Sequence, residues 1–209
     1  MWAVAEGEEP VLRPGLHLAC AVSEAERVRL ASAGMNTLRA VRSGTRPALA
    51  SRTLADGPAG GSDWKYLAAR RLALFIMASV ERGTRWLVFE RNGPEAWQRA
   101  RAQTEAFLEA LDQEGAFAGA QADESYFVIC DERLNGPPQT LQACIRLLFG
   151  FAALRPGEFH ACLVTHQAGR SSARPVSVNR LATSGRRVGE EIETALLRGI
   201  VGSGQDCAP

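Results

Sequence analysis

The sequence has no strong excess of charge of either sign. Its 209 residues contain 24 Lys and Arg against 23 Asp and Glu, which gives a formal net charge of +1. Nucleic-acid-binding domains usually carry a clear basic excess, so this balance argues against a nucleic-acid partner. No apolar run approaches the ~20 residues that a membrane-spanning helix needs. We therefore expect neither a nucleic acid nor a membrane among the partners.

Cysteine is sparse and irregularly spaced. The five cysteines form an odd set with wide gaps, which argues against a disulfide framework. We expect them to be reduced thiols in a protein made in the cytoplasm. The first 14 residues carry acidic side chains and lack the apolar segment of a secretory signal.

Motifs for catalysis or cofactor binding are also missing. His160 and Cys162 alternate on an expected strand, but two ligands fall short of the four of a structural zinc site. A triad drawn from Asp131, His160 and a serine lacks the G-x-S-x-G motif. The loop Gly57–Ser62 precedes a helix, as a phosphate loop does, but lacks the Gly-Lys-Ser/Thr ending. We expect no catalytic residue, metal or cofactor, and a small α/β nucleotide-binding enzyme that uses this loop remains the alternative from another class.

The residues that are present suit a soluble core, with 46% hydrophobic and 22% charged. Ser23 and Glu26 form a capping box for a helix to about Ala33, with Gly34 as its stop. Helical spacing predicts two longer helices. The first, over 64–82, should bury a stripe of Leu67, Leu74, Phe75 and Ala78. The second, over 94–114 with Gly115 as its stop, should bury Trp97, Thr104, Phe107, Leu108 and Leu111. Strands are expected over 15–22, 36–41, 48–51, 85–89, 125–130, 141–149 with one face buried, and 158–164.

This order of elements predicts an α/β (α+β) fold in which helices pack on a mixed sheet, with extended terminal arms. We expect a flexible leader over 1–14, a folded domain over 15–164 and a C-terminal arm or tail over 165–209. The tail is rich in Ser, Arg and Gly, apart from a strand-like segment over 175–178 and a helical pattern over 190–200. The large aromatic residues should be core anchors, and they are Trp64, Tyr66, Trp86, Phe89, Trp97 and Phe107.

Several segments in order resemble the C-terminal domain of contractile tail sheath proteins, a family that includes phage tail sheaths, R-type bacteriocins and extracellular contractile injection systems. The segment over 23–39 resembles the family's acid-rich helix followed by a turn of the Gly-(Ile/Val)-Asn type. After it come Arg52-Thr53-Leu54, Trp64-Lys65-Tyr66 and Arg70-Arg71-Leu72, which resemble further family signatures. The segment 83–90 resembles a family strand that ends in Phe89-Glu90. Further matches are Trp97, Phe107-Leu108, Leu111, Gly115-Ala116, Gly119, 124–131 and 155–159, including Pro156 and Phe159.

The match covers roughly residues 15–164, and it departs from the family pattern at several points. Arg91 stands where the family usually has proline, Ala48-Leu49-Ala50-Ser51 replaces a common Val-Trp-Gly-Ala, and Gly157 replaces a common alanine. The bulky N-terminal and middle domains of the family have no counterpart in this sequence. The chain therefore looks like the inner, lattice-forming domain with a C-terminal tail of its own.

The resemblance implies a structural subunit of a contractile sheath rather than an enzyme. Its expected partners are copies of itself in a helical homo-oligomer, an inner tube protein, a baseplate and a paralogous sheath protein. Strand exchange between neighbours is implied as the lattice link, with Leu16, Leu18, Val22, Val176 and Val178 as candidate inter-subunit strand residues. The alternative within this class is a sheath-like cap, baseplate or initiator protein present in few copies. Arg70 or Arg71 is either paired with an acid such as Glu90 or simply exposed.

Overall fold

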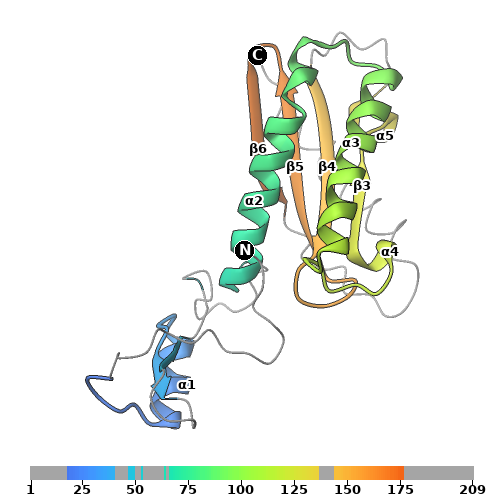
Figure 1. Ribbon diagram of the computed structural model, residues 1–209. Coiled ribbons are helices and arrows are strands. Elements are labelled where there is room, and N and C mark those ends of the chain that lie inside the picture. Colours follow the sequence, from blue (N-terminus) through green and yellow to red (C-terminus); the bar gives the residue numbers. More distant parts are fainter. Residues whose placement is uncertain are drawn as a thin grey trace. The chain divides into compact units, whose positions relative to one another are not determined.

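A computed structural model describes residues 18–40, 47–49, 53, 64, 66–136 and 144–176 (Figure 1). The chain divides into two compact units, Met1–Leu72 and Ala73–Pro209. The leader, the loop over 54–63 and the helix expected over 190–200 all lie outside the described residues.

The first unit contains a capped helix and a small strand pair. Helix α1 (Glu24–Ser32) begins at the predicted capping box, because the Ser23 hydroxyl accepts from the Glu26 amide and the Glu26 carboxylate accepts from the Ser23 amide. The chain leaves the helix through Gly34 at φ 79°. Strands β1 (Leu38–Ala40) and β2 (Pro47–Leu49) fall close to the two strands expected over 36–41 and 48–51, and they pair antiparallel. The strand expected over 15–22 is wrong for residues 18–22, which form a bend and irregular chain.

The second unit is built on a four-stranded antiparallel sheet in the order β3-β4-β5-β6. The strands are β3 (Tyr126–Ile129), β4 (Cys144–Ala152), β5 (Phe159–Gln167) and β6 (Arg170–Val176). The α+β class is confirmed, although all the described strand pairs are antiparallel and the sheet is therefore not mixed. Consecutive strands are neighbours, which explains why short connections suffice.

The helices α2 (Leu67–Gly83) and α3 (Pro94–Gln113) lie side by side over one face of this sheet (Figure 1). Phe75 and Phe107 bring the two helices together, with ring centroids 6.3 Å apart. The expected buried side of α3 is confirmed at Trp97, Thr104 and Leu111, whereas Phe107 is only half-buried. Gly115 has φ 73° directly after the helix, which suits its predicted role as the stop.

The stripe predicted for α2 is wrong. Leu67 and Leu74 are 38% and 49% exposed. The buried side consists of Ala69, Leu72, Ala73, Ile76, Met77 and Val80. Because apolar residues occur almost all round this helix, helical spacing fits more than one stripe, and only the packing decides which one is buried.

The segment Arg85–Phe89 is the 3-10 helix η1, not the expected strand. Its aromatic and β-branched residues favour a strand locally. The segment directly follows α2, however, and its Leu87 and Glu90 amides donate to the Thr84 and Leu87 carbonyls, so tight turns replace strand pairing. Two one-turn helices, α4 (Ala122–Ser125) and α5 (Glu132–Asn135), precede and follow β3.

Strand β4 is buried along its whole length, so the expected burial of one face only is wrong. Phe151 faces the helix side, where the ring of Phe117 stacks on it at 5.7 Å. The opposite face packs against Leu134 of α5 in a cluster with Ile129, Leu148, Ala152, Phe159, Ala161 and Leu163. Both faces of β4 therefore contribute to the core.

Two further expectations are wrong in part, namely the end of the folded domain at residue 164 and the reduced state of all the cysteines. Strand β5 runs past Val164 to Gln167, and Arg170–Val176 pairs with it as β6, so the first part of the expected tail belongs to the sheet. The cysteines Cys20, Cys130 and Cys162 are free thiols. Cys144 is disulfide-bonded, so the expectation of reduced thiols is wrong there, because sequence spacing does not show which thiols come together in space.

Candidate assembly interface

Strand β6 forms one edge of the sheet (Figure 1), and among the described strands its only partner is β5. Its side chains are exposed or half-buried throughout. Pro175 has no backbone donor and lies opposite Cys162, and proline occurs in sheets mainly on edge strands. An edge strand carries unpaired backbone groups on its outer side, and these groups can accept an added strand.

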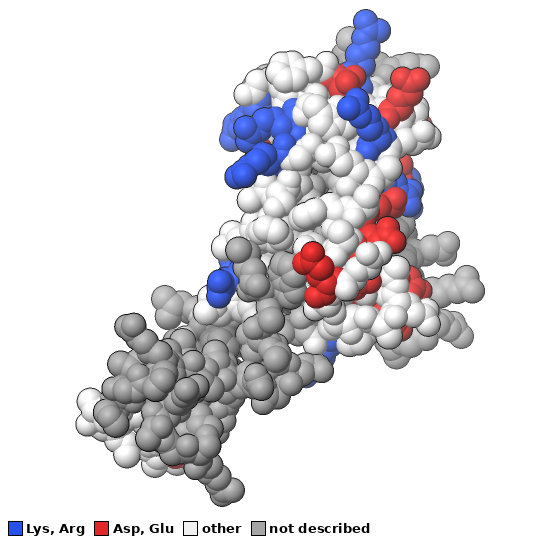
Figure 2. All heavy atoms as spheres, in the orientation of Figure 1, with Lys and Arg blue, Asp and Glu red and all other residues white. Residues whose placement is uncertain are grey.

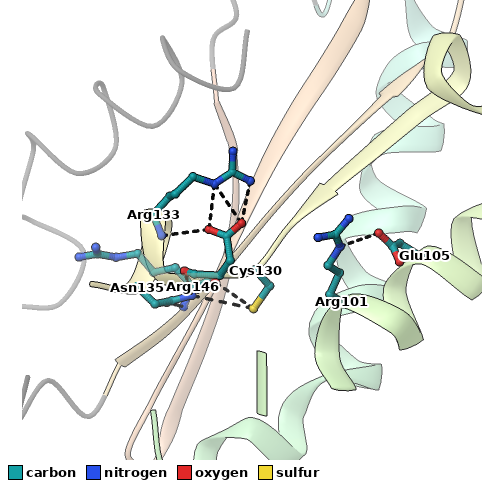
Figure 3. Close-up of polar contacts among 7 residues, drawn as sticks. Arg101, Glu105, Cys130, Arg133, Asn135 and Arg146 are labelled. Atoms are coloured by element: carbon teal, nitrogen blue, oxygen red, sulfur yellow. Dashed lines mark hydrogen bonds and ion pairs between the residues drawn. The ribbon is translucent and has the colours of Figure 1, made fainter. Parts of the chain in front are cut away.

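The other edge of the sheet is closed at its upper end by a side chain. Strand β3 ends at Ile129, which pairs with Leu148. Two residues away along β4, beyond the end of β3, the Asn135 amide oxygen accepts from the Arg146 amide at 2.6 Å, and its Nδ2 donates to the Arg146 carbonyl at 3.0 Å (Figure 3). The buried Asn135 side chain thus makes the pair of hydrogen bonds that a neighbouring strand would make there.

Two local features hold Asn135 in this position. Asp131 caps α5 by accepting from the Arg133 amide at 3.0 Å, and its carboxylate also pairs with the Arg133 guanidinium at 2.7 Å (Figure 3). The thiol of Cys130 lies against the same groups and donates to the Arg146 carbonyl at 3.5 Å. Burial, together with the nearby Asp131 charge, raises the Cys130 pKa to about 12, so this thiol stays protonated and unreactive.

A buried histidine connects the helix layer to the edge strand. His166 of β5 makes 2.8 Å hydrogen bonds to Thr84 through Nε2 and to Ser171 of β6 through Nδ1. Thr84 already donates to the Val80 carbonyl at 2.7 Å. Thr84 therefore accepts from His166, which leaves Nδ1 to accept from Ser171. Burial is the main cause that lowers the His166 pKa, to about 4, with Glu81 acting against this shift and Arg85 adding to it.

Two aromatic residues of η1, one half-buried and one exposed, follow Thr84 in the chain. Trp86 is half-buried, donates to the Gln103 side chain at 3.0 Å and has the Arg99 guanidinium 4.1 Å above its ring. Phe89 is 90% exposed, so its prediction as a core anchor is wrong. Glu90 pairs with Arg99 at 3.9 Å, not with Arg70 or Arg71 as considered from the sequence.

The other residues singled out from the sequence differ in their burial and in their contacts. Trp97 is buried, and its Nε1 donates to Asn92 at 2.7 Å. Arg70 lies 5.4 Å over the ring of the half-buried Trp64. Tyr66 is half-buried and Arg71 is exposed, while Pro156 is exposed and Phe159 is buried in the core. Arg52, Leu16 and Val178 lie outside the described residues.

The candidate strand residues also differ among themselves. Leu18 and Val22 are half-buried and in no strand, and Val176 already pairs with Ala161 in its own sheet. Their inter-subunit role stays a prediction. Sequence reasoning missed Asn135 and the His166 network, because neither belongs to a recognisable motif and their partners are distant in sequence.

The described residues give no support to a metal site or to a membrane-spanning helix. His160 and Cys162 do alternate on one strand, as expected, and both are buried. Within the described ranges, no group of three or more potential ligands could hold a metal ion. None of the described helices is long and apolar enough to cross a membrane. The loop Gly57–Ser62 lies outside the part of the chain that the structure describes.

Comparisons with known proteins point to one class of particle. No family model matches the sequence, and no curated protein matches it. A chain in the cryo-EM structure of the anti-feeding prophage (AFP) baseplate is similar, with 29% identity and a TM-score of 0.57 over 68% of this chain and 38% of that chain. A chain in the contracted PVC sheath complex, an extracellular contractile injection system, is 25% identical with a TM-score of 0.59 over 73% of this chain and 43% of that one. The protein thus spans about two fifths of these chains and is similar in structure to components of contractile injection systems.

Proposed function

We propose that this protein is a non-enzymatic structural subunit of a contractile sheath, linked to its neighbours by strand exchange. The likeness to a chain of a contractile sheath complex supports the class of particle. The observation that carries the proposal is the open β6 edge, opposite a β3 edge at which Asn135 occupies the position of a strand.

Strand addition suits a sheath because it connects rigid domains through main-chain hydrogen bonds. Such a link is preserved when the domains rotate relative to one another. We propose β6 as the acceptor edge, since Val176 is already engaged in the sheet of its own chain. The donor is the segment around Leu16, Leu18 and Val22 of one neighbour or the segment that includes Val178 of another.

The finer assignments follow from this role. The part of the chain from 15 to the end of β6 serves as the lattice domain, and the segments before and after it serve as arms. Copies of the same chain form the helical homo-oligomer, which surrounds an inner tube protein and meets a baseplate and a paralogous sheath chain.

A second candidate is a cap, baseplate or initiator protein present in few copies. It is favoured by the likeness to a chain in a baseplate structure. Electron microscopy of the purified chain, alone and with the inner tube protein, separates the two. Long helical tubes support the sheath subunit, whereas rings or isolated chains support the second candidate.

Arm deletions test the strand-exchange link. Deleting residues 1–22 or, separately, 178–209 should preserve the circular dichroism spectrum, and at least one deletion should abolish tubes. A deletion from Thr165 onward is unsuitable, because it removes the end of β5 and all of β6. Normal tubes from both truncated chains would contradict strand exchange. Micromolar ATP or GTP binding that is lost on changing Gly60 and Gly61 would instead favour the enzyme.

A further inference from the structure

The second unit has two distinct ends, set by the direction of its strands. At one end, Thr84 bonds to His166 close to the turn between β5 and β6, so η1 lies beside that turn. At the other end, the Ala118 amide donates to the Ala152 carbonyl, and the Gly157 amide donates to the Glu124 carbonyl. The nine-residue strands β4 and β5 separate these ends by about 27 Å. We name them the η1 end and the α4 end.

The two ends differ in their unpaired charges. Arg82, Arg91 and Arg170 are exposed near the η1 end, and so are the acidic residues Glu95 of α3 and Glu132 of α5. None of these five forms an ion pair within the described residues. The acidic residues Glu81 and Glu90 at this end are paired with Arg85 and Arg99. Near the α4 end the exposed charges without an ion pair to a described residue are acidic, namely Glu109, Glu114 and Asp123. Figure 2 shows most of the basic side chains in view over the upper part of this unit, together with acidic ones, and a group of acidic side chains lower down.

The cluster of acidic residues at the α4 end is electrostatically unfavourable in the isolated subunit. Glu109 and Asp112 lie in the last turns of α3 and Glu114 follows directly, where the helix dipole already places negative charge. No basic residue occupies the last turn of this helix to offset them. The pKa of the nearby Tyr126 is raised, first by burial and then by Glu109, Asp112 and Glu105. A cationic surface placed against this group would remove the repulsion.

Each end also exposes an apolar group. Phe89, at the η1 end, is 90% exposed. Leu154 is 37% exposed and lies beside the exposed Pro156 in the connection between β4 and β5, at the α4 end. Aromatic residues in the centre of an interface, surrounded by polar and charged residues, contribute most of the binding energy in many complexes. Both ends therefore present apolar surface, beside three unpaired arginines and two unpaired acidic residues at the η1 end and three unpaired acidic residues at the α4 end.

We propose that the η1 end of one copy binds the α4 end of the next copy, with Phe89 against Leu154 and Pro156 and with Arg82 and Arg91 facing Glu109 and Glu114. This inference rests on the proposed function only in requiring that copies assemble. Such a contact joins two different surfaces, so it can repeat from copy to copy along a lattice. The contact is separate from strand addition at β6, and it accounts for both exposed ends of the unit.

Charge reversal of each end, alone and in mixture, tests the contact on the full chain. One variant carries Arg82→Glu and Arg91→Glu, and the other carries Glu109→Arg and Glu114→Arg. We expect each variant alone to need a concentration at least about tenfold higher than the wild type for assembly in sedimentation experiments. An equimolar mixture should assemble at the wild-type concentration, because each reversed end then meets a reversed partner.

Three controls make the result decisive. Circular dichroism should show both variants folded, and the control Arg29→Glu with Arg71→Glu, which changes the net charge equally, should assemble as the wild type does. Phe89→Ala should weaken assembly without changing its salt dependence. Normal assembly of both charge variants, or failure of the folded mixture to recover, would overturn this contact while leaving strand exchange untouched. Absence of any wild-type assembly would count against the proposed function instead.

Discussion

Helices α1 and α3 are both preceded by a clear start signal, yet they depend on different interactions. In α1 no residue is buried, and the capping box of Ser23 and Glu26 is its main stabilising feature. In α3 six residues are buried, and the helix begins at Pro94 without a side-chain cap. Local hydrogen bonds thus define the first helix, whereas packing against the sheet and α2 defines the second. Mutations should separate these two sources of stability.

The largest effect is expected for Trp97→Ala in α3. Trp97 is 4% exposed and donates to Asn92. Its truncation removes a large buried ring and leaves Asn92 without this donor, which should lower the free energy of unfolding by about 3–5 kcal/mol. Urea denaturation measures the change.

Phe89→Ala is the matched control, because it removes an aromatic ring that is 90% exposed. Its effect on the free energy of unfolding should stay within about 0.5 kcal/mol. Equal effects of the two substitutions would show that the burial described for α3 is wrong.

An intermediate effect is expected from acidification, again in the second unit. The His166 pKa of about 4 lies below its ordinary value of 6.5, so the unfolded chain binds more protons between these two values. The contribution of His166 to stability is therefore complete above pH 6.5 and is lost as the pH falls towards 4. The urea midpoint, measured at steps across this window, should fall with pH.

His166→Gln provides the control for this pH dependence. Glutamine retains a donor and an acceptor for Thr84 and Ser171 but does not titrate. The difference in midpoint between pH 6.5 and pH 4 should be smaller in this variant. An unchanged pH dependence would mean that other groups cause it.

The smallest effect is expected for Ser23→Ala in α1. Loss of the cap should destabilise this helix by about 1 kcal/mol and leave the unfolding of the second unit unchanged. Hydrogen exchange of the amides over 24–32 measures it. Ser32→Ala is the control, because the Ser32 hydroxyl bonds only to the Arg29 carbonyl in the last turn, and alanine favours the helix. Equal acceleration of exchange in both variants would contradict the capping role.

The same contrast explains how much of the fold was predictable from the sequence. The cap at Ser23, the stop at Gly115 and the limits of α3 depend on residues close together in the chain, and all were predicted correctly. The stripe of α2 and the state of Arg85–Phe89 depend on which surface meets the sheet, and both predictions were wrong. In such segments tertiary packing overrides the local preference for a strand or a helix.

The candidate interface was less predictable than the fold. The extension of the sheet through β6 was missed, because Ser and Arg are frequent in that segment and only its pairing with β5 shows it to be a strand. The closure of the other edge depends on Asn135 and Arg146, eleven residues apart, and on a side chain making backbone-like hydrogen bonds. No spacing rule in a single sequence reports such a contact.

The side-chain closure at Asn135 limits where the sheet can be extended. An ordinary open sheet has two edges and can grow in both directions. In this sheet the side-chain amide of Asn135 bonds to β4 beyond Ile129, where β3 would otherwise continue. The opposite edge is the seven-residue strand β6. At the corner that Asn135 closes, the backbone groups of Arg146 are already bonded within the chain, so an added strand can pair along the outer side of β3 or of β6 but not with Arg146.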